Sequence, residues 1–423
     1  MSIYGAMFAG VSGLAAQSNA LGMISDNIAN VNTVGYKGTS ARFSTLVTQA
    51  ATQTTHTPGG VTSSPYSYIN RQGLLQGSAS GTDLAVAGQG FFVVNESANP
   101  GFGDDFYFTR AGSFNPDQNG NLVNAAGYYL QGYNLRSNPT PAPSASTFTG
   151  LETVNIANLS GSAAATTNIA LGVNLPSTAT TVAPGNSFSV TAQVFDSLGN
   201  AHDMDITFTK TASNTWTWAA SNPTLDGGAT SSGSAVGSGA ITFDTDGTPL
   251  AFSPVAPSIT LTGFTTGAGN ATITLDLGTV GATDGLTQFS GDFTISNIDQ
   301  DGVRFGNYTG ITISEDGIVT ALFDNGQRQP IYQLPLGMFR NPNGLEAKTG
   351  NVYLETDRSG NFQLNLAGNG GAGDIAPAAL ESSTVDLAEE FTKMIITQRA
   401  YSANTKVITT ADDMLEELIR VKR

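Results

Sequence analysis

The sequence predicts a multidomain α+β protein in which helices from both ends of the chain form a terminal α-helical coiled coil, next to two mainly-β domains. Three observations predict this fold class. Apolar residues repeat every seven positions near both termini, the hydrophobic period changes to two in the middle of the chain, and a Pro-rich stretch divides that middle. The outer β domain is expected to be inserted in the inner one.

The C-terminal segment carries one apolar seam. Large apolar side chains recur there every seven residues or lie beside that line: Leu387, Phe391, Met394, Tyr401, Ile408 and Leu415. Asp386 and Glu389 match a capping box, and Arg420 falls in the last turn, where positive charge suits the helix dipole. Such a seam is typical of a core helix packed on its own domain, or of a helix that finds its partner elsewhere in the chain.

The N-terminal segment supplies that partner, because it carries a second seam at helical spacing: Met7, Leu14, Leu21, Ile24, Ile28 and Val31. Asp26 is the only ionisable side chain before Lys37, so the other faces are small and neutral and suit a crowded bundle. We expect residues 1–31 to pair with 380–423. Since each helix buries only one line of side chains, both ends are predicted to be disordered in the monomer and to fold on assembly.

The middle of the chain is predicted to be nested. Residues 32–70 with 366–379 form a linker, and 71–150 with 285–365 form an inner β domain. The Pro-rich stretch SNPTPAPSAS leads into the outer inserted β domain, 151–284. Lys210 is the only basic residue from 151 to 285, against nine acidic ones, so an acidic outer domain is expected.

Composition excludes several classes of partner. The chain of 423 residues has a formal charge of −16 and no basic cluster, so neither a nucleic acid nor a membrane is predicted as a partner. No apolar run approaches the roughly 20 residues that span a bilayer. The chain has no Cys, which excludes disulfides. It also has no basic residue before Lys37, so we expect no cleaved signal peptide and, for an exported protein, another route.

No arrangement of residues indicates catalysis, a metal site or a cofactor, and we expect a protein that is not an enzyme. The two histidines, His56 and His202, have no ligand spacing around them and are predicted at the surface. Residues 115–120 and 297–302 imitate the start of a calcium loop. Both lack the acidic twelfth ligand and are predicted to be hairpin turns.

Long terminal motifs resemble a known family. SGLAAQSNALGMISDNIANVNTVGYKGTSARF (12–43) and VDLAEEFTKMIITQRAYSANTKVITTADDMLEEL (385–418) are similar to the two terminal signatures of the bacterial flagellar rod and hook family of axial proteins. GLLQGSASGTDLAVAGQGFFVV (73–94) resembles its first β domain. VFDSLGNAHDMDITFTK (194–210) resembles the hook members of the family, and much of 211–284 has no match.

The resemblance implies a structural subunit of the flagellar hook, which self-assembles into a curved, flexible tube and transmits torque from rod to filament. It implies the distal rod protein, the hook cap, the hook–filament junction protein and the flagellar type III export apparatus as partners, and an extracellular place on the flagellum. The seam residues would be assembly contacts. The alternatives are a distal rod protein of the same family and a secreted β-rich adhesin or binding module.

Overall fold

A computed structural model describes the following residues of the chain: 3–46, 59–101, 103–136, 139–142, 144–157, 159, 161–182, 186–226, 228 and 230–421. The chain packs as two compact units. Unit 1 comprises Met1–Asn158, Ile311–Ala321 and Gln329–Arg423, and unit 2 comprises Leu159–Gly310 and Leu322–Arg328. The strands β26 and β27 contain residues of both units.

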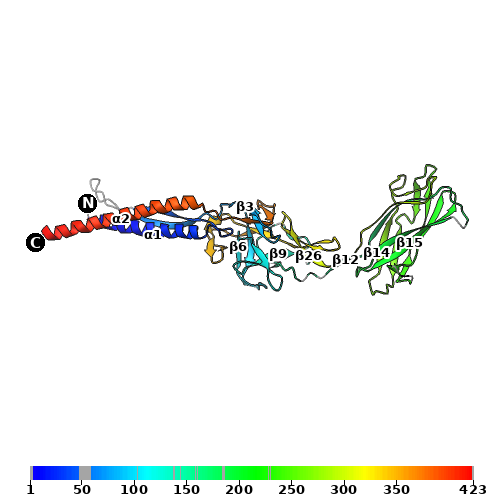
Figure 1. Ribbon diagram of the computed structural model, residues 1–423, viewed down its shortest axis with the longest axis horizontal. Helices are drawn as coiled ribbons and strands as arrows, with labels where there is room; N and C mark the ends of the chain where they lie inside the picture. The colour runs from blue at the N-terminus through cyan, green and yellow to red at the C-terminus, as the bar shows by residue number, and fades with distance from the viewer. Residues whose placement is uncertain are drawn as a thin grey trace. The chain divides into compact units, whose positions relative to one another are not determined.

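Two long helices from opposite ends of the chain lie side by side in unit 1, α1 (Ile3–Ala29) and α2 (Leu387–Val421) (Figure 1). They are antiparallel, because Gly10 lies against Ile408 and Gly13 against Asn404. The pairing of the two ends, which the sequence predicts, is therefore present. The residues expected to form a linker also contain an antiparallel hairpin, β1 (Thr39–Leu46) and β2 (Gly60–Ser67), which packs against α1.

The β part of unit 1 is built on a sheet of 14 strands whose main path runs β10-β32-β29-β5-β9-β28-β27-β26. The strands on that path have these bounds: β10 (Ser144–Ala145), β32 (Gln363–Leu366), β29 (Pro335–Met338), β5 (Phe91–Asn95), β9 (Tyr129–Asn134), β28 (Arg328–Gln333), β27 (Ile318–Phe323) and β26 (Tyr308–Ile313). The others join it at the side: β6 (Phe106–Thr109), β7 (Phe114–Pro116), β8 (Leu122–Asn124), β11 (Leu151–Thr153), β30 (Glu346–Lys348) and β31 (Val352–Leu354).

Two small antiparallel ribbons join the two ends of the chain within unit 1. One pairs β3 (Leu75–Gly77) with β34 (Ala379–Glu381), and the other pairs β4 (Leu84–Ala87) with β33 (Asp374–Pro377). A short 3-10 helix, η1 (Pro342–Gly344), follows β29. The core of this unit is rich in aromatic rings; Phe108 lies edge-on to Phe339 with ring centroids 4.7 Å apart. The chain therefore enters and leaves this core side by side.

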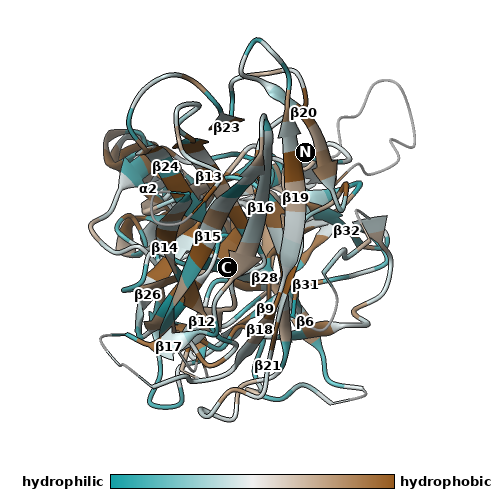
Figure 2. Cartoon of the chain, turned by 90° about the vertical axis from the view of Figure 1, so that its right-hand side faces the viewer, coloured by the Kyte–Doolittle hydropathy of each residue, from teal (hydrophilic) through white to brown (hydrophobic). Residues whose placement is uncertain are grey.

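Unit 2 is a sandwich of two mainly antiparallel sheets (Figure 2). One sheet contains β14 (Ser187–Phe195), β15 (Ala201–Ala212), β16 (Thr215–Ala220), β17 (Thr224–Leu225), β19 (Ser238–Phe243) and β20 (Pro249–Ser253). The other contains β13 (Asn168–Asn174), β18 (Ser234–Val236), β21 (Ser258–Thr262), β22 (Ala271–Asp276), β23 (Leu286–Thr287) and β24 (Thr294–Gln300). β12 (Ser162–Ala164) pairs with β25 (Val303–Gly306).

Alternation along the strands explains the core of unit 2. In β15, Met204, Ile206 and Phe208 are buried while residues between them are partly or fully exposed, as expected for a strand with one face on the core. The buried indole of Trp216 donates to Gln288 Oε1 at 2.8 Å. Unit 2 also takes in 285–310, which the sequence assigns to the inner β domain, because β24 pairs with β13 and β25 with β12. The other predicted domain boundaries stay predictions.

Candidate assembly site

The start of α2 is capped as the sequence predicts. Asp386 Oδ1 accepts hydrogen bonds from the backbone N–H groups of Ala388 at 2.8 Å and Glu389 at 3.1 Å. These bonds satisfy two of the four donors that a helix leaves free at its N-terminus. Lys393 then bonds Glu389 and Glu390, at 2.9 and 2.8 Å. The first turns of α2 are therefore well defined, and they present their charges on one side.

The buried residues of the helix pair are mostly small or polar, and they include the seam residue Ile24. In α1 the buried residues are Gly10, Gly13, Ala16, Ala20, Ile24 and Asn27. In α2 they are Glu390, Thr397 and Ala411. A Cβ atom at Gly10 would lie 3.0 Å from Ile408 Cγ1, so the two backbones approach closely. Near the base of the pair, Asn27 Nδ2 donates to Glu390 Oε2 at 3.1 Å.

The predicted seam residues have three different environments in the single chain. Ile24 is buried. The following residues are half-buried: Met7, Leu14, Leu21, Ile28, Val31, Met394, Ile408 and Leu415. Leu387, Phe391 and Tyr401 are 41%, 47% and 41% exposed. The structure thus brings part of each seam to the helix pair and leaves the rest facing outward. As contacts between subunits, these twelve residues stay a prediction.

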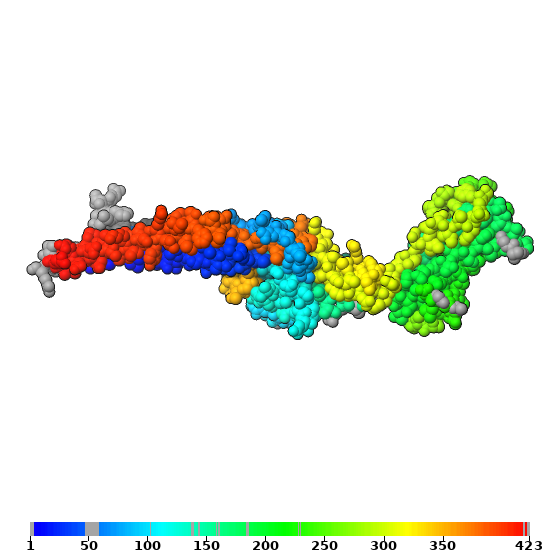
Figure 3. Space-filling model, viewed as in Figure 1, coloured from blue at the N-terminus to red at the C-terminus, as the bar shows by residue number. Residues whose placement is uncertain are grey.

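Further apolar side chains on the outer faces of the helices have no partner in the pair. In α1, Tyr4, Phe8 and Val11 are 73%, 64% and 55% exposed. They follow each other at spacings of four and three, which is one face of a helix, so this stripe could have been found in the sequence. In α2 the exposed apolar residues also include Ile395, Ile396, Val407, Met414 and Ile419. The surfaces of α1 and α2 run along each other in the space-filling view (Figure 3).

The segment that follows α1 and the segment that precedes α2 are joined by main-chain hydrogen bonds. Gly35 N donates to Glu381 O at 2.7 Å, and Thr384 N donates to Tyr36 O at 3.1 Å. Gly35 has φ +67°, and a Cβ atom there would lie 2.6 Å from the carbonyl carbon of Arg110. Only glycine fits this position, since it needs both a left-handed backbone and close approach to another chain segment.

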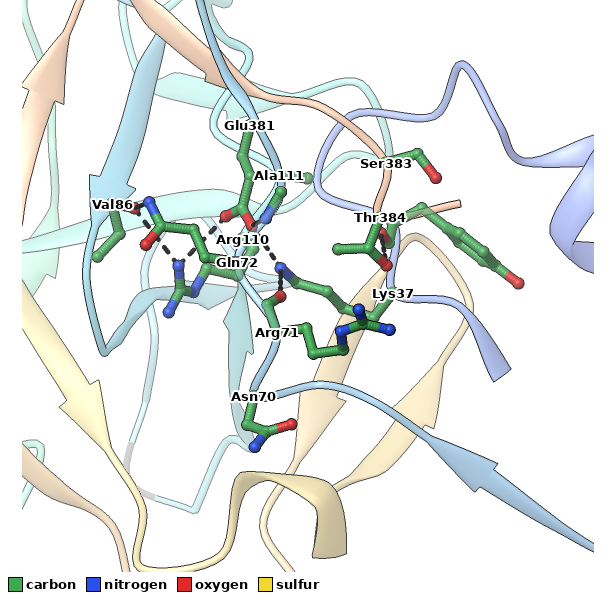
Figure 4. Close-up of polar contacts among 12 residues, drawn as sticks. Lys37, Asn70, Arg71, Gln72, Val86, Arg110, Ala111, Glu381, Ser383 and Thr384 are labelled. Atoms are coloured by element: carbon green, nitrogen blue, oxygen red, sulfur yellow. Dashed lines mark hydrogen bonds and ion pairs between the residues drawn. The ribbon is translucent and has the colours of Figure 1, made fainter. Parts of the chain in front are cut away.

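A buried ionic cluster lies where these two segments meet the β part of unit 1 (Figure 4). The carboxylate of Glu381 pairs with Lys37 through Oε1 and with Arg110 NH1 through Oε2, the latter at 3.2 Å. Lys37 Nζ also donates to Arg71 O at 2.6 Å, and Arg110 NH2 to Gly88 O at 2.8 Å. All three charged side chains are at most 4% exposed. We call Lys37, Arg110 and Glu381 the ionic joint.

The electrostatics of the ionic joint follow from burial. Two cations share one anion, so the cluster carries one uncompensated positive charge away from water. Burial lowers the pKa of Lys37, and the charge of Glu381 only partly opposes this. The pKa of Arg110 is lowered for the same reason, and its guanidinium lies 5.1 Å from the Phe91 ring centroid. The sequence contained no signal for this cluster, because Glu381 lies 344 residues from Lys37 and 271 residues from Arg110 along the chain.

One prediction about the histidines is wrong, and the other falls outside the described residues. His202 is fully buried in unit 2, where Nδ1 lies 2.7 Å from Ser232 Oγ and Nε2 lies 3.1 Å from Asp196 Oδ2. It was mispredicted because its position in β15, facing the core, brings it between two residues that satisfy both ring nitrogens. His56 is not among the described residues.

The His202 arrangement has the order of a Ser–His–Asp triad but lacks access. Ser232, His202 and Asp196 are each at most 1% exposed, and Phe264 packs on the imidazole with ring centroids 4.9 Å apart. Burial opposes ionisation of Asp196, but hydrogen bonds from Thr266 and Asn200 outweigh it and lower the pKa of the carboxyl well below its usual range. The group therefore holds the core of unit 2 together rather than meeting a substrate.

The two turn predictions have different outcomes. Residues 115–120 do turn between the paired strands β7 and β8, and Asp117 Oδ1 accepts from Asn119 N and Asn121 N, both at 2.8 Å. The second prediction, for 297–302, is wrong as a hairpin, because β24 and β25 pair with other strands. There, Asp301 Oδ1 accepts a hydrogen bond from the backbone N–H of Thr167 at 2.7 Å, within unit 2.

Two further properties of the described part of the chain bear on other functions. Across that part, no group of three or more acidic or histidine side chains is arranged to hold a metal ion. Neither described helix has a stretch long and apolar enough to cross a membrane. The features that remain are an outward-facing apolar helix pair and the joint that holds it on a β unit. Both features lie in unit 1 and are built from segments at the two ends of the chain.

Comparison with known proteins identifies the family to which this chain belongs. Four family profiles match, described as Flagella basal body rod protein (7–37), Flagellar hook protein FlgE/F/G D1 domain (85–192), Flagellar basal body protein FlaE D2 domain (176–303) and Flagellar basal body rod FlgEFG protein C-terminal (376–421). The flagellar hook protein FlgE of Rhizobium meliloti is 38% identical over 429 residues, covering 100% of both chains. That of Brucella suis is 36% identical with the same coverage, and that of Salmonella typhimurium 32% over 97% of this chain and 98% of its own. The chain belongs to the flagellar hook protein family.

Proposed function

We propose that this protein is the hook subunit that polymerises into a curved, flexible tube and transmits torque from rod to filament. The observation that carries the proposal is the helix pair, whose inner contact uses small residues while large apolar side chains face outward on both α1 and α2. Each outward-facing large side chain gains about 1.5–3 kcal/mol when a neighbour buries it. Side-by-side packing of many pairs would bury these faces.

The charged face of α2 would then line the inner channel of the tube. Its members are Glu389, Lys393, Arg399, Lys406, Asp413 and Glu417. Charges stay next to water at lower cost than in a packed layer, and α1 has no charge to compete for that surface except Asp26. Charge reversal at Arg399 or Lys406 should leave the β structure intact, as read by circular dichroism, and reduce hook assembly and motility. Unchanged motility would place this face elsewhere.

Flexibility would come from β surfaces with few strong pairs. Only 12% of residues are charged, and Gly, Ser and Thr are abundant in the middle of the chain. Few ion pairs hold one register between neighbouring subunits, so contacts can slide between near-equivalent positions. The inner helices hold the subunits together while the β units move.

Assembly into the hook also implies partners and a route. The partners we propose are other copies of the chain, the distal rod protein, the hook cap, the hook–filament junction protein and the flagellar type III export apparatus. The finished hook lies outside the cell.

Polymerisation of the purified protein in high salt tests the function. Curved tubes in electron micrographs support a hook subunit, straight tubes support a distal rod protein, and no polymer supports a binding module. Phe391→Asp should prevent tube formation because it places a charge on the outward apolar face of α2. The matched control is Leu250→Asp, which changes a residue of similar exposure in unit 2 and should polymerise as the unchanged protein does.

A further inference from the structure

Asparagine followed directly by glycine is a chemically labile pair, and the chain contains four such pairs, at Asn119, Asn325, Asn343 and Asn369. In this pair the backbone nitrogen of glycine can attack the side-chain amide carbon of asparagine, because glycine has no side chain to hinder the approach. The attack needs a backbone N–H that is not held elsewhere and a backbone that can rotate toward the side chain. The fold therefore decides which of the four asparagines reacts.

Three of the four glycine N–H groups are held in tight turns. The N–H groups of Gly120, Gly326 and Gly344 each donate to the carbonyl oxygen three residues earlier in the chain, at 3.0, 3.1 and 3.0 Å. Gly120 is also packed closely, since a Cβ atom there would lie 2.2 Å from Ala157 Cβ. Each of these turns must open before its nitrogen can reach the side chain, so the reaction proceeds only from the small population of open turns.

Two of these three asparagines are held by their side chains as well. Asn325 Nδ2 donates to Ser162 O at 2.9 Å and to Arg304 O at 2.7 Å. Asn343 Oδ1 accepts a hydrogen bond from Asn70 N at 3.0 Å. Rotation of either amide toward the following glycine would break these bonds and leave the partner groups unsatisfied. The fold therefore protects Asn325 and Asn343 in two ways.

The fourth pair, Asn369 and Gly370, lies in the turn between β32 and β33, and both residues are exposed. Within the part of the chain that the structure describes, no atom accepts a hydrogen bond from the N–H of Gly370. The Asn369 side chain makes one long hydrogen bond, from Nδ2 to Ala367 O at 3.4 Å. The neighbours Gly368 and Gly371 have φ +72° and +83°, and glycine changes such a backbone without a side-chain penalty.

We propose that Asn369 is a site of spontaneous deamidation in the folded protein. Gly370 N attacks Asn369 Cγ, so that an N–Cγ bond forms, the Cγ–Nδ2 bond breaks, and the amide leaves as ammonia with the proton of the Gly370 nitrogen. Water from the solvent then opens the resulting cyclic succinimide. Cleavage of the N–Cγ bond gives aspartate, and cleavage of the bond to the backbone carbonyl carbon gives isoaspartate. The reaction needs no enzyme, oxidant or reductant.

The products change both the charge and the backbone of this turn. Ala372 N donates to Asn369 O at 3.0 Å, and Gly368 N donates to Gly373 O at 3.1 Å, so the turn is closed by two main-chain bonds. In isoaspartate the main chain runs through the side-chain carbons, and the oxygen that Ala372 contacts becomes part of a free carboxylate. The turn that leads into β33 therefore gains a negative charge and a longer backbone.

Peptide mapping by mass spectrometry tests the site. The purified full-length protein is incubated at pH 8, digested at acidic pH, and each asparagine–glycine peptide is assayed over time for the mass gain of deamidation. Asn369 should react about fivefold faster than the other three, which is the factor expected from one intact turn hydrogen bond. In urea, where all the turns are open, the four rates should converge. Equal rates in the folded protein would overturn the proposal, and a preference for Asn369 that persists in urea would overturn the role of the fold.

Isoelectric focusing of two matched variants gives a second measurement. Asn369→Gln and Asn119→Gln each replace an exposed asparagine of a turn, and circular dichroism verifies that both fold. The unchanged protein should accumulate a more acidic band during the incubation, because an amide becomes a carboxylate. Asn369→Gln should remove most of this band, and Asn119→Gln should leave it unchanged. An acidic band that grows as fast in Asn369→Gln as in the unchanged protein would refute the site.

Discussion

The helix pair of unit 1 and the sandwich of unit 2 bury their apolar residues in opposite ways. The sandwich encloses Trp216, Trp218 and Phe208 almost completely within its own two sheets. The helix pair encloses mainly glycine, alanine and polar side chains, and leaves Tyr4 and Phe8 largely exposed. One region therefore encloses its large apolar side chains, whereas the other leaves several of them exposed.

This difference separates a region that closes its apolar core within one chain from a region that leaves apolar surface open to further contacts. Ordering each backbone residue costs about 1–2 kcal/mol, and small side chains return little of this when buried. The sandwich offsets the cost within one chain. Neighbours that cover the outer faces of the helix pair would offset the rest, so we predict that assembly and folding of the ends are coupled.

The largest expected effect is a difference in protease resistance within the monomer. Thermolysin suits the comparison because it cuts at apolar residues, which both regions contain, whereas unit 2 has few sites for trypsin. We expect α1 and α2 to be cleaved in the monomer well before unit 2, and to be protected in assembled tubes. Mass spectrometry of the fragments over time measures both rates. A monomer whose helices survive as long as unit 2 would refute the coupling of folding to assembly.

The next effect concerns the ionic joint that holds the helix pair on its β unit. Glu381→Gln removes the only anion between Lys37 and Arg110, so two buried cations remain without a counter-charge. We expect a loss of about 3–5 kcal/mol in the free energy of unfolding of unit 1, measured by urea denaturation. Thermal melting of unit 2 should not change.

The matched control for this variant is Glu346→Gln. Glu346 pairs with Lys348 at 2.8 Å, but both side chains are at least 40% exposed, so the cost should stay below about 1 kcal/mol. Equal effects of Glu381→Gln and Glu346→Gln would show that burial of the joint has no energetic importance.

Periodic features of this chain could be predicted from the sequence, and the contacts that depend on three dimensions could not. The helices, their pairing and the β middle follow from spacings of seven, three to four and two. The close approach of the helices at Gly10 and Gly13 was not predicted, because hydrophobicity alone marks large residues. Large residues such as Phe391 are left facing outward.

Contacts between distant segments gave no local signal. Nothing in the sequence distinguishes Lys37 or Glu381 from other charged residues, and His202 was predicted at the surface, since their partners are set by the fold. The hairpin β1–β2 was missed because its residues are polar and many are exposed, so the alternation of apolar and polar residues is absent.

A smaller effect should distinguish the two regions by the pH dependence of their stability. The pKa of Asp196 is lowered in the folded state, so its ionised form stabilises unit 2 above the usual carboxyl pKa, and this stability is lost as the pH falls from about 5. Asp196→Asn should remove on the order of 2 kcal/mol at pH 7 and flatten the decline of the melting temperature between pH 5 and 3. A variant with the decline of the unchanged protein would show that other carboxyls cause it.

The smallest effect compares two glycines of α1. Glycine to alanine in a helix gains about 1 kcal/mol where space allows. A Cβ atom at Gly22 meets nothing within 4 Å, whereas one at Gly13 would lie 2.8 Å from Asn404 Nδ2. Gly22→Ala should therefore slow thermolysin cleavage of α1 in the monomer about fivefold, because cleavage follows the population of the open helix. Gly13→Ala should slow it less or speed it, since Asn404 must move; equal slowing would mean that the two helices are apart in the monomer.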